Sequence, residues 1–160
     1  MICNIRIDDR LIHGQVATMW VPHLKANRAV IVDNKVAADE VRKSLLKMAA
    51  PEGCKVLIFN AETAAEKLIN SKNPDTRILI LCNGPQAIYE MMQKGLKVDE
   101  VTIGNMSHKN DSRSIRKTIF ITEEEKECFI RMEDLGVRFI SQMIPTEAED
   151  ESAMDDIRKA

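Results

Sequence analysis

Short apolar runs alternate along the chain with longer segments in which apolar residues recur every three or four positions. The short runs have the length and continuity of strands buried in a sheet, whereas the longer segments have the spacing of amphipathic helices. Strands are predicted at residues 2–7, 29–32, 56–59, 78–81, 98–103, 118–121 and 137–141. Because strand and helix patterns take turns along the chain, the sequence predicts βαβ units and a mostly parallel sheet.

Helix signals fill the gaps between these strands. Pro22 is expected to disturb the first helix or end it early, because proline has no backbone N–H and clashes with the preceding turn. The second helical segment carries Val41, Leu45 and Met48 at helical spacing. Thr122 precedes three glutamates, which is a favourable helix start. Helices are predicted at residues 15–25, 37–50, 61–69, 85–92 and 123–135, followed by an acidic, loosely packed helix or tail at 147–158.

Together these elements predict the fold class α/β and a three-layer sandwich. An open, mostly parallel sheet of about seven strands is expected between layers of helices, with the strand at 137–141 antiparallel at one edge. The chain has 160 residues, which favours one domain and suffices for a sizeable core. No internal repeat and no low-complexity linker interrupts it, so we expect residues 1–160 to form a single domain.

Composition narrows the class of protein. Hydrophobic residues make up 44% and charged residues 30% of the chain, as in ordinary soluble globular proteins. A formal net charge of −2 gives no argument for binding to nucleic acid or to an anionic membrane. No apolar run approaches the length of about 20 residues that spans a bilayer, and the amino terminus lacks the features of a signal peptide. We therefore expect a cytoplasmic protein.

The four cysteines are Cys3, Cys54, Cys82 and Cys128, and they are widely scattered, without Cys-x-x-Cys spacing. Cysteines scattered in this way indicate neither a zinc site nor a disulfide framework. Three of the four lie in apolar surroundings and are expected to be buried, reduced thiols.

The densest group of reactive side chains lies directly after the first predicted strand. This stretch reads Arg6-Ile7-Asp8-Asp9-Arg10-Leu11-Ile12-His13-Gly14-Gln15-Val16. The carboxyl end of a strand is where open α/β sheets place their reactive groups. A neutral imidazole, whose ordinary pKa is about 6.5, has a free ring nitrogen that can attack phosphorus. We therefore expect His13 to be a nucleophile that carries a phosphoryl group.

The neighbours of His13 suit the same chemistry. Arg10 can meet phosphoryl oxygens with a planar, two-pronged donor. The backbone N–H groups of Gly14, Gln15 and Val16 would form a second anion site if they open a helix. These residues are therefore expected to bind or orient the phosphoryl group.

Asp8 and Asp9 are expected to act on the imidazole. Either carboxylate could hold the second ring nitrogen of His13 and fix its tautomer. A simpler interpretation is that the histidine is a hydrogen-bonded turn residue and that the two aspartates cap the following helix. The residues alone leave both interpretations open.

A second polar segment follows the strand predicted at 98–103. Residues 105–117 contain four cations against one aspartate, and a loop of this length is usually functional or mobile. Because loops after parallel strands gather at one edge of the sheet, Gly104, Asn105 and this segment could border His13. A solvated turn is an equal alternative, and His108 is expected to be a bystander.

Three other classes of protein fit these residues less well. A nucleotide-binding enzyme would fit the fold, but no Gly-x-Gly-x-x-Gly and no Walker-type loop occurs. A metal-dependent hydrolase could use Asp8, Asp9, His13 and His108, although their spacing specifies a metal site poorly. A regulatory module with this fold would not need both Arg10 and His13. Among phosphoryl carriers, Cys82 is the only other candidate, and it lacks a neighbouring cation.

The stretch Arg6–Val16 strongly resembles the amino-terminal signature of the IIB components of the mannose/fructose/sorbose family of the bacterial phosphoenolpyruvate-dependent sugar phosphotransferase system. The resemblance continues through the Gly104-Asn105 turn, the strand-to-helix junction at 119–125 and Pro145-Thr146, and so covers essentially the whole chain.

This resemblance implies a phosphotransferase with a phosphohistidine intermediate. His13 would take a phosphoryl group from a histidine of the IIA component and pass it to a sugar held by the membrane IIC/IID permease. The protein would be peripherally associated with that permease. We expect no metal and no organic cofactor, and the sequence leaves open whether the chain forms a homo-oligomer.

Overall fold

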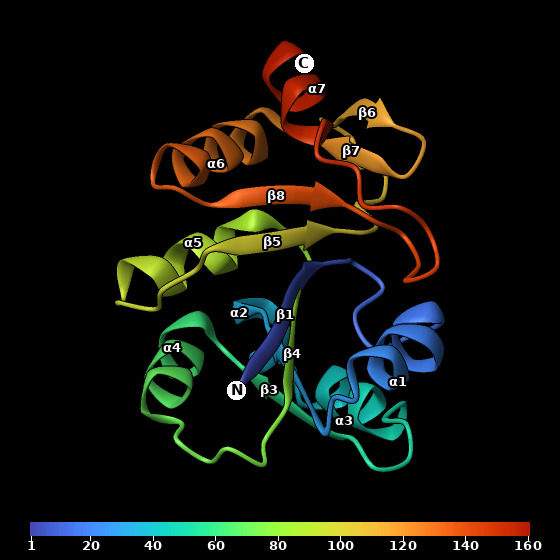
Figure 1. The fold of residues 1–160 in the computed structure, drawn as a ribbon, viewed down its shortest axis with the longest axis vertical. Helices are drawn as coiled ribbons and strands as arrows, with labels where there is room; N and C mark the ends of the chain where they lie inside the picture. The colour runs from blue at the N-terminus through green and yellow to red at the C-terminus, as the bar shows by residue number, and fades with distance from the viewer.

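The computed structural model describes residues 1–160 and is built around a six-stranded, entirely parallel sheet (Figure 1). The strand order is β3-β2-β4-β1-β5-β8. These strands are β1 (Ile2–Ile7), β2 (Arg28–Val32), β3 (Lys55–Phe59), β4 (Ile78–Cys82), β5 (Glu100–Ile103) and β8 (Arg138–Ser141). The sequence shows nearly continuous apolar runs in the central strands because helices cover both faces of the sheet.

Helices form the two outer layers of the sandwich. The smaller apolar core lies under η1, α1 and α3, and the larger lies under α4, α5, α6 and α7. In Figure 1, α1 and α3 lie on the opposite side of the sheet from α4, α5 and α6. The helices are η1 (Val16–Trp20), α1 (Val21–Leu24), α2 (Asn34–Ala37), α3 (Glu40–Met48), α4 (Ala61–Asn70), α5 (Pro85–Gln93), α6 (Glu123–Asp134) and α7 (Ala153–Lys159). None of them has the length and apolarity that a membrane crossing requires. The predicted three-layer α/β fold is confirmed.

The predicted antiparallel edge strand is wrong. β8 pairs with β5 in parallel, because α6 is a crossover that returns the chain to the same end of the sheet. Antiparallel pairing occurs instead in a separate two-stranded unit, β6 (Arg113–Arg116) with β7 (Ile119–Ile121). The main sheet accordingly has six strands, and the run predicted at 118–121 belongs to the small pair.

The first helix is disturbed as Pro22 predicts. Residues 16–20 form a π-helical turn, and the N–H of Val21 donates to the carbonyl of Val16, five residues back. Pro22 lies in the first turn of α1, where its missing N–H is tolerated. Trp20, at the junction, is only 3% exposed and anchors this segment in the smaller core.

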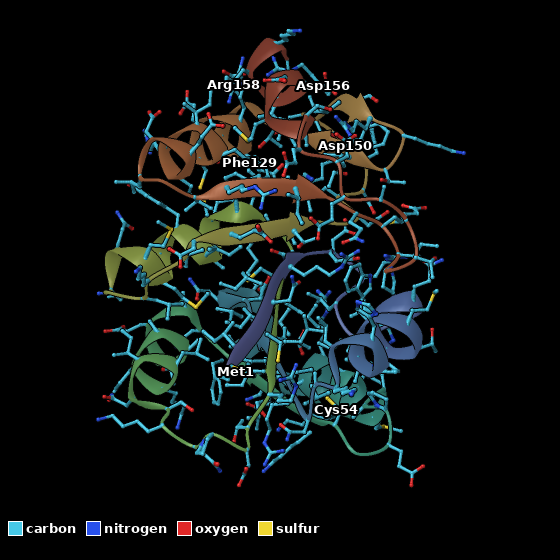
Figure 2. The ribbon with its side chains drawn as sticks, in the orientation of Figure 1. Met1, Cys54, Phe129, Asp150, Asp156 and Arg158 are labelled. Carbon is cyan, nitrogen blue, oxygen red and sulfur yellow. The ribbon has the colours of Figure 1, made fainter.

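The carboxyl-terminal segment is packed more firmly than its acidic composition suggests. Arg116 in β6 forms ion pairs with Asp150 and Asp156, both of which Figure 2 labels beside α7 and the β6–β7 pair. The apolar side of α7 buries Met154 and Ile157 in the larger core. The prediction of a loosely packed tail is therefore wrong for residues 153–159.

The helix α3 buries a different side from the one that its spacing suggests. Leu46 is 3% exposed and belongs to the smaller core. Val41, Leu45 and Met48, which share one side of the helix, are exposed by 72%, 58% and 82%. A helix is confirmed at Glu40–Met48, shorter than the predicted range 37–50, because α2 ends at Ala37 and Asp39 caps a new helix. The apolar stripe of this helix faces away from the sheet.

Candidate functional site

The loop between β1 and η1 lies at the carboxyl edge of the sheet, at the point where the connections after neighbouring strands leave toward opposite faces. After β1 the chain turns toward the face covered by α1, whereas after its neighbours β4 and β5 it turns toward α5 and α6 (Figure 1). Such a division opens a crevice at the strand ends, which is the usual ligand site of open α/β sheets. His13 is in this loop, and its side chain is exposed.

Two apolar residues hold the loop against the core. Leu11 and Ile12 are 1% and 0% exposed, although both lie between exposed or half-exposed polar neighbours. Leu11 has φ 55°, a left-handed conformation that is uncommon for a branched side chain, and Gly14 has φ 59°. The buried pair therefore fixes the backbone while leaving His13 at the surface.

A buried carboxylate positions Arg10. The Asp8 side chain is fully buried and accepts hydrogen bonds from Nε and Nη2 of Arg10 at 2.9 and 2.7 Å. Nη1 of Arg10 donates to Oε1 of Gln15 at 3.0 Å. The hydrogen bonds to Asp8 raise the pKa of Arg10 above its ordinary value, so the guanidinium stays charged. Arg10 is thus held in a fixed orientation with 27% of its side chain exposed.

A second arginine supports Asp8 from inside the protein. Nε of Arg6 donates to Asp8 at 3.3 Å, and its two terminal nitrogens donate to the carbonyls of Gln142 and Met143 at 2.8 and 2.9 Å. The guanidinium lies 4.3 Å from the ring centre of Trp20. Burial lowers the pKa of Arg6 to about 10 despite its pairing with Asp8, and this still leaves it charged at neutral pH.

The second carboxylate joins the loop to the segment after β5. Asp9 accepts hydrogen bonds from Nδ2 of Asn105 at 2.7 Å and from the N–H of Ser107 at 2.6 Å. The backbone N–H of Asp9 donates to the carbonyl of Asn105 at 2.9 Å. The expected proximity of residues 104–105 to the first loop is therefore observed.

The sequence suggested that Asp8 or Asp9 holds a ring nitrogen of His13. In the structure neither carboxylate forms a hydrogen bond with the imidazole. The oxygens of Asp8 are occupied by Arg6 and Arg10, and those of Asp9 by Asn105 and Ser107. Their positions show that Asp8 orients Arg10 and that Asp9 fastens the neighbouring segment.

The backbone at the start of the helical segment offers unused donors. Gln15 is the N-cap residue of η1, in the helical conformation, and η1 begins at Val16. The N–H groups of Gly14, Gln15 and Val16 make no hydrogen bond to any other group of the chain. This arrangement keeps the donors that the sequence indicated for an anion.

Most cations of residues 105–117 are neutralised by carboxylates. Lys109 lies 3.3 Å from Glu125, Arg113 lies 2.5 Å from Glu123, and Arg116 joins the acidic segment before α7. His108 contacts the ring of Phe120 edge-to-face. The segment thus serves mainly to attach the β6–β7 pair to α6 and α7. No three His, Cys, Asp or Glu side chains are grouped so that they could hold a metal ion.

Helix α3 contributes residues that the sequence analysis missed. Arg42 and Leu45 line an open depression of about 440 Å³ together with Asp9, Arg10 and His13. Arg42 is exposed and its side chain forms no ion pair. The sequence could not indicate this proximity, because it depends on the order of strands in the sheet.

Cys82 is unsuited to carry a phosphoryl group in this structure. Its side chain is completely buried at the end of β4. Burial, with a further contribution from the charge of Asp33, raises the pKa of the Cys82 thiol far above its ordinary value. The thiolate that would act as nucleophile is therefore strongly disfavoured.

Comparisons with known proteins place this geometry in a family. Residues 2–160 match the model of the phosphotransferase system sorbose subfamily IIB component. The sorbose-specific EIIB component of Lacticaseibacillus casei is 33% identical over 147 residues, covering 92% of this chain and 90% of the relative. The mannose-specific EIIAB component of Escherichia coli (strain K12) is 30% identical over 142 residues, covering 89% of this chain and 44% of the relative.

A solved structure agrees along the whole chain. The crystal structure of the IIBSor domain of the sorbose permease from Klebsiella pneumoniae superposes with a TM-score of 0.92 and 30% identity, covering 100% of this chain and 98% of that chain. The family model and this superposition both extend over the loop between β1 and η1, the β6–β7 pair and α7. The chain therefore belongs to the sorbose subfamily of IIB components of the phosphotransferase system.

Proposed function

We propose that His13 receives a phosphoryl group from a histidine of the IIA component and passes it to a sugar held by the membrane IIC/IID permease. Membership of the IIB family implies phosphoryl transfer during sugar uptake. One observation supports the residue assignment above all. An exposed imidazole shares its depression with a guanidinium that a buried carboxylate holds in place. In this proposal residues 1–160 act as a single domain at the membrane permease.

The proposed first step exchanges one phosphorus–nitrogen bond for another. A ring nitrogen of His13 attacks phosphorus in line while the bond from phosphorus to the donor imidazole breaks, and the proton on the other ring nitrogen of His13 passes to the leaving imidazole or to solvent. In the second step a sugar hydroxyl attacks, the bond from phosphorus to His13 breaks, and the hydroxyl proton passes to the leaving imidazole or to solvent. Phosphoryl transfer of this kind depends mainly on positioning and charge neutralisation.

Arg10 supplies that charge with donors to spare. Of the five N–H groups of a guanidinium, Asp8 and Gln15 accept three. One of the remaining two is in only weak contact with the sulfur of Met143, at 3.7 Å, and the other has no acceptor. The unused backbone N–H groups of residues 14–16 offer further donors to the phosphoryl oxygens.

The test of this function is a reconstituted labelling reaction. The protein is incubated with labelled phosphoenolpyruvate, the general phosphotransferase proteins and a cognate IIA component. We expect stoichiometric label that is lost in acid and retained in alkali, as for phosphohistidine. Acid-stable label would point to Cys82, and the absence of label with an active IIA component would overturn the proposal.

Replacing Arg10 with alanine is expected to slow both transfer steps about 100-fold, which is the effect of removing one well-placed donor to a developing charge. Arg10→Lys keeps the charge but loses the two-pronged geometry, so its rates should fall between those of Arg10→Ala and the unchanged protein. The fold should persist, because Asp8 keeps its bonds to Arg6. Single-turnover rates and the melting temperature measure these effects.

Arg113→Ala is the matched control, since that arginine is exposed and paired with Glu123 outside the site. Equal rates for Arg10→Ala and Arg113→Ala would remove Arg10 from the mechanism.

A further inference from the structure

The exposed side of α3 carries an apolar stripe that the fold does not use. Val41, Leu45 and Met48 are spaced four and three residues apart, so their side chains follow one another along the helix. Isolated apolar residues on a surface are normal, but a contiguous row marks a candidate contact surface. The other large exposed apolar residues, Met1, Ile69 and Leu135, lie on separate elements.

The stripe begins at the rim of the proposed phosphorylation site. Leu45 belongs both to the stripe and to the depression that contains His13, and Arg42 lines the same depression. A protein that delivers a group to His13 must cover this rim. The stripe would then be removed from water in the same contact.

The charges around the stripe are mostly positive. Of the cations on α3, Lys43 is paired with Glu40 at 3.3 Å, whereas Arg42 and Lys47 have no carboxylate partner. Arg10 also lines the depression, and the oxygens of Asp9, the one carboxylate among the lining residues, accept hydrogen bonds from Asn105 and Ser107. An apolar surface with unpaired cations beside it is complementary to an apolar patch that surrounds an anion.

We propose that Val41, Leu45, Met48 and Arg42 form the docking surface for the phosphorylated IIA component, an inference that rests on the proposed function. The donor carries its phosphoryl group as an anion, which Arg42 and Arg10 attract. The permease, in contrast, exposes cytoplasmic loops that are enriched in lysine and arginine in membrane proteins generally. Charge complementarity therefore selects the donor rather than the permease as the partner of this surface.

Kinetics with separate donor and acceptor steps test the inference. Met48→Glu and Val41→Glu change side chains that do not line the depression, and each should raise the KM for phosphorylated IIA component at least tenfold. The rate at saturating donor should change by less than about threefold, because the groups around His13 stay in place. Arg42→Glu should raise the same KM.

Leu135→Glu provides the matched control, because Leu135 is 64% exposed at the end of α6, outside the depression. Its KM should equal that of the unchanged protein. In the second step, protein that has already been phosphorylated is mixed with permease vesicles and sugar. Met48→Glu should lose its phosphoryl group there at the unchanged rate.

The possible failures are distinct. If the unchanged protein is not labelled at His13, the proposed function itself fails. If labelling is normal but Met48→Glu leaves the donor KM unchanged, or Leu135→Glu raises it equally, the docking surface is wrong. An effect confined to the permease step would assign the stripe to the permease and would also overturn the inference.

Discussion

Replacing His13 with alanine is expected to abolish labelling from the IIA component without disturbing the fold. The imidazole is the only group in the depression that can accept the phosphoryl group as a neutral nucleophile, because the adjacent side chains are carboxylates, arginines and apolar residues. The label should fall to the background of a reaction from which only this protein is omitted. The exposed ring contributes little to stability, so the free energy of unfolding should change by about 0.5 kcal/mol or less.

His108→Ala is the control for this variant. His108 is also exposed, but it contacts Phe120 in the segment that attaches the β6–β7 pair. Its label should remain stoichiometric and acid-labile. Full labelling of the His13 variant, or loss of label in the His108 variant alone, would move the phosphoryl carrier away from His13.

Replacing Gly104 with alanine is expected to destabilise the protein by about 3 kcal/mol and to slow phosphoryl transfer as well. A Cβ atom at this position would lie 2.1 Å from Nη2 of Arg6 and 2.7 Å from Oδ2 of Asp8. Arg6 cannot simply swing aside, because it is fully buried and bonded to the carbonyls of residues 142 and 143. The methyl group must therefore disrupt a buried ion pair, a change that typically costs about 3–5 kcal/mol.

The loss of rate follows from the same contact. When Asp8 is displaced, Arg10 loses two of the three hydrogen bonds that its guanidinium makes to oxygen atoms and keeps only the one to Gln15. Thermal unfolding should show a melting temperature lower by about 6–12 °C. Single-turnover labelling below that temperature should show a fall toward the rate of Arg10→Ala.

Gly84→Ala separates this effect from ordinary crowding. A Cβ atom there would lie 2.6 Å from the amide oxygen of Gln86, whose exposed side chain can rotate away, and 3.1 Å from Oε2 of the buried Glu125, outside the site. The free energy of unfolding should fall by less than in Gly104→Ala, and the transfer rate should be nearly unchanged. If Gly104→Ala is as stable and as active as Gly84→Ala, the contact among Gly104, Arg6 and Asp8 is not required.

Local pattern was sufficient to predict most of the sheet. The apolar runs at 29–32, 56–59 and 78–81 form strands that are covered by helices on both faces. Their apolar composition therefore reflects their position in the sheet directly. The helix start at Thr122 is also confirmed, because its hydroxyl accepts from the N–H of Glu125 and the glutamate side chain accepts from Thr122. These features depend on neighbours within a few residues.

Features that depend on distant parts of the chain were not predictable in the same way. The partners of Asp8 include Arg6, whose orientation is fixed by carbonyls more than 130 residues away. Arg116 looked like part of a free basic loop, and its carboxylate partners lie 34 and 40 residues later. The stripe on α3 had the spacing of a core side, and only the packing of Leu46 shows which side is buried. In each case the missing information was which elements meet in space.

If His13 carries the phosphoryl group as proposed, the anchoring of Leu11 and Ile12 beneath the surface has a consequence for how it works with two partners. With the peptide anchored by Leu11 and Ile12 before the imidazole and by the buried Val16 after it, that ring cannot travel between donor and acceptor on a swinging arm. Both proteins must present themselves in turn at one stationary point. Turnover should then depend on how often they meet this chain, and on how quickly one departs to make way for the other.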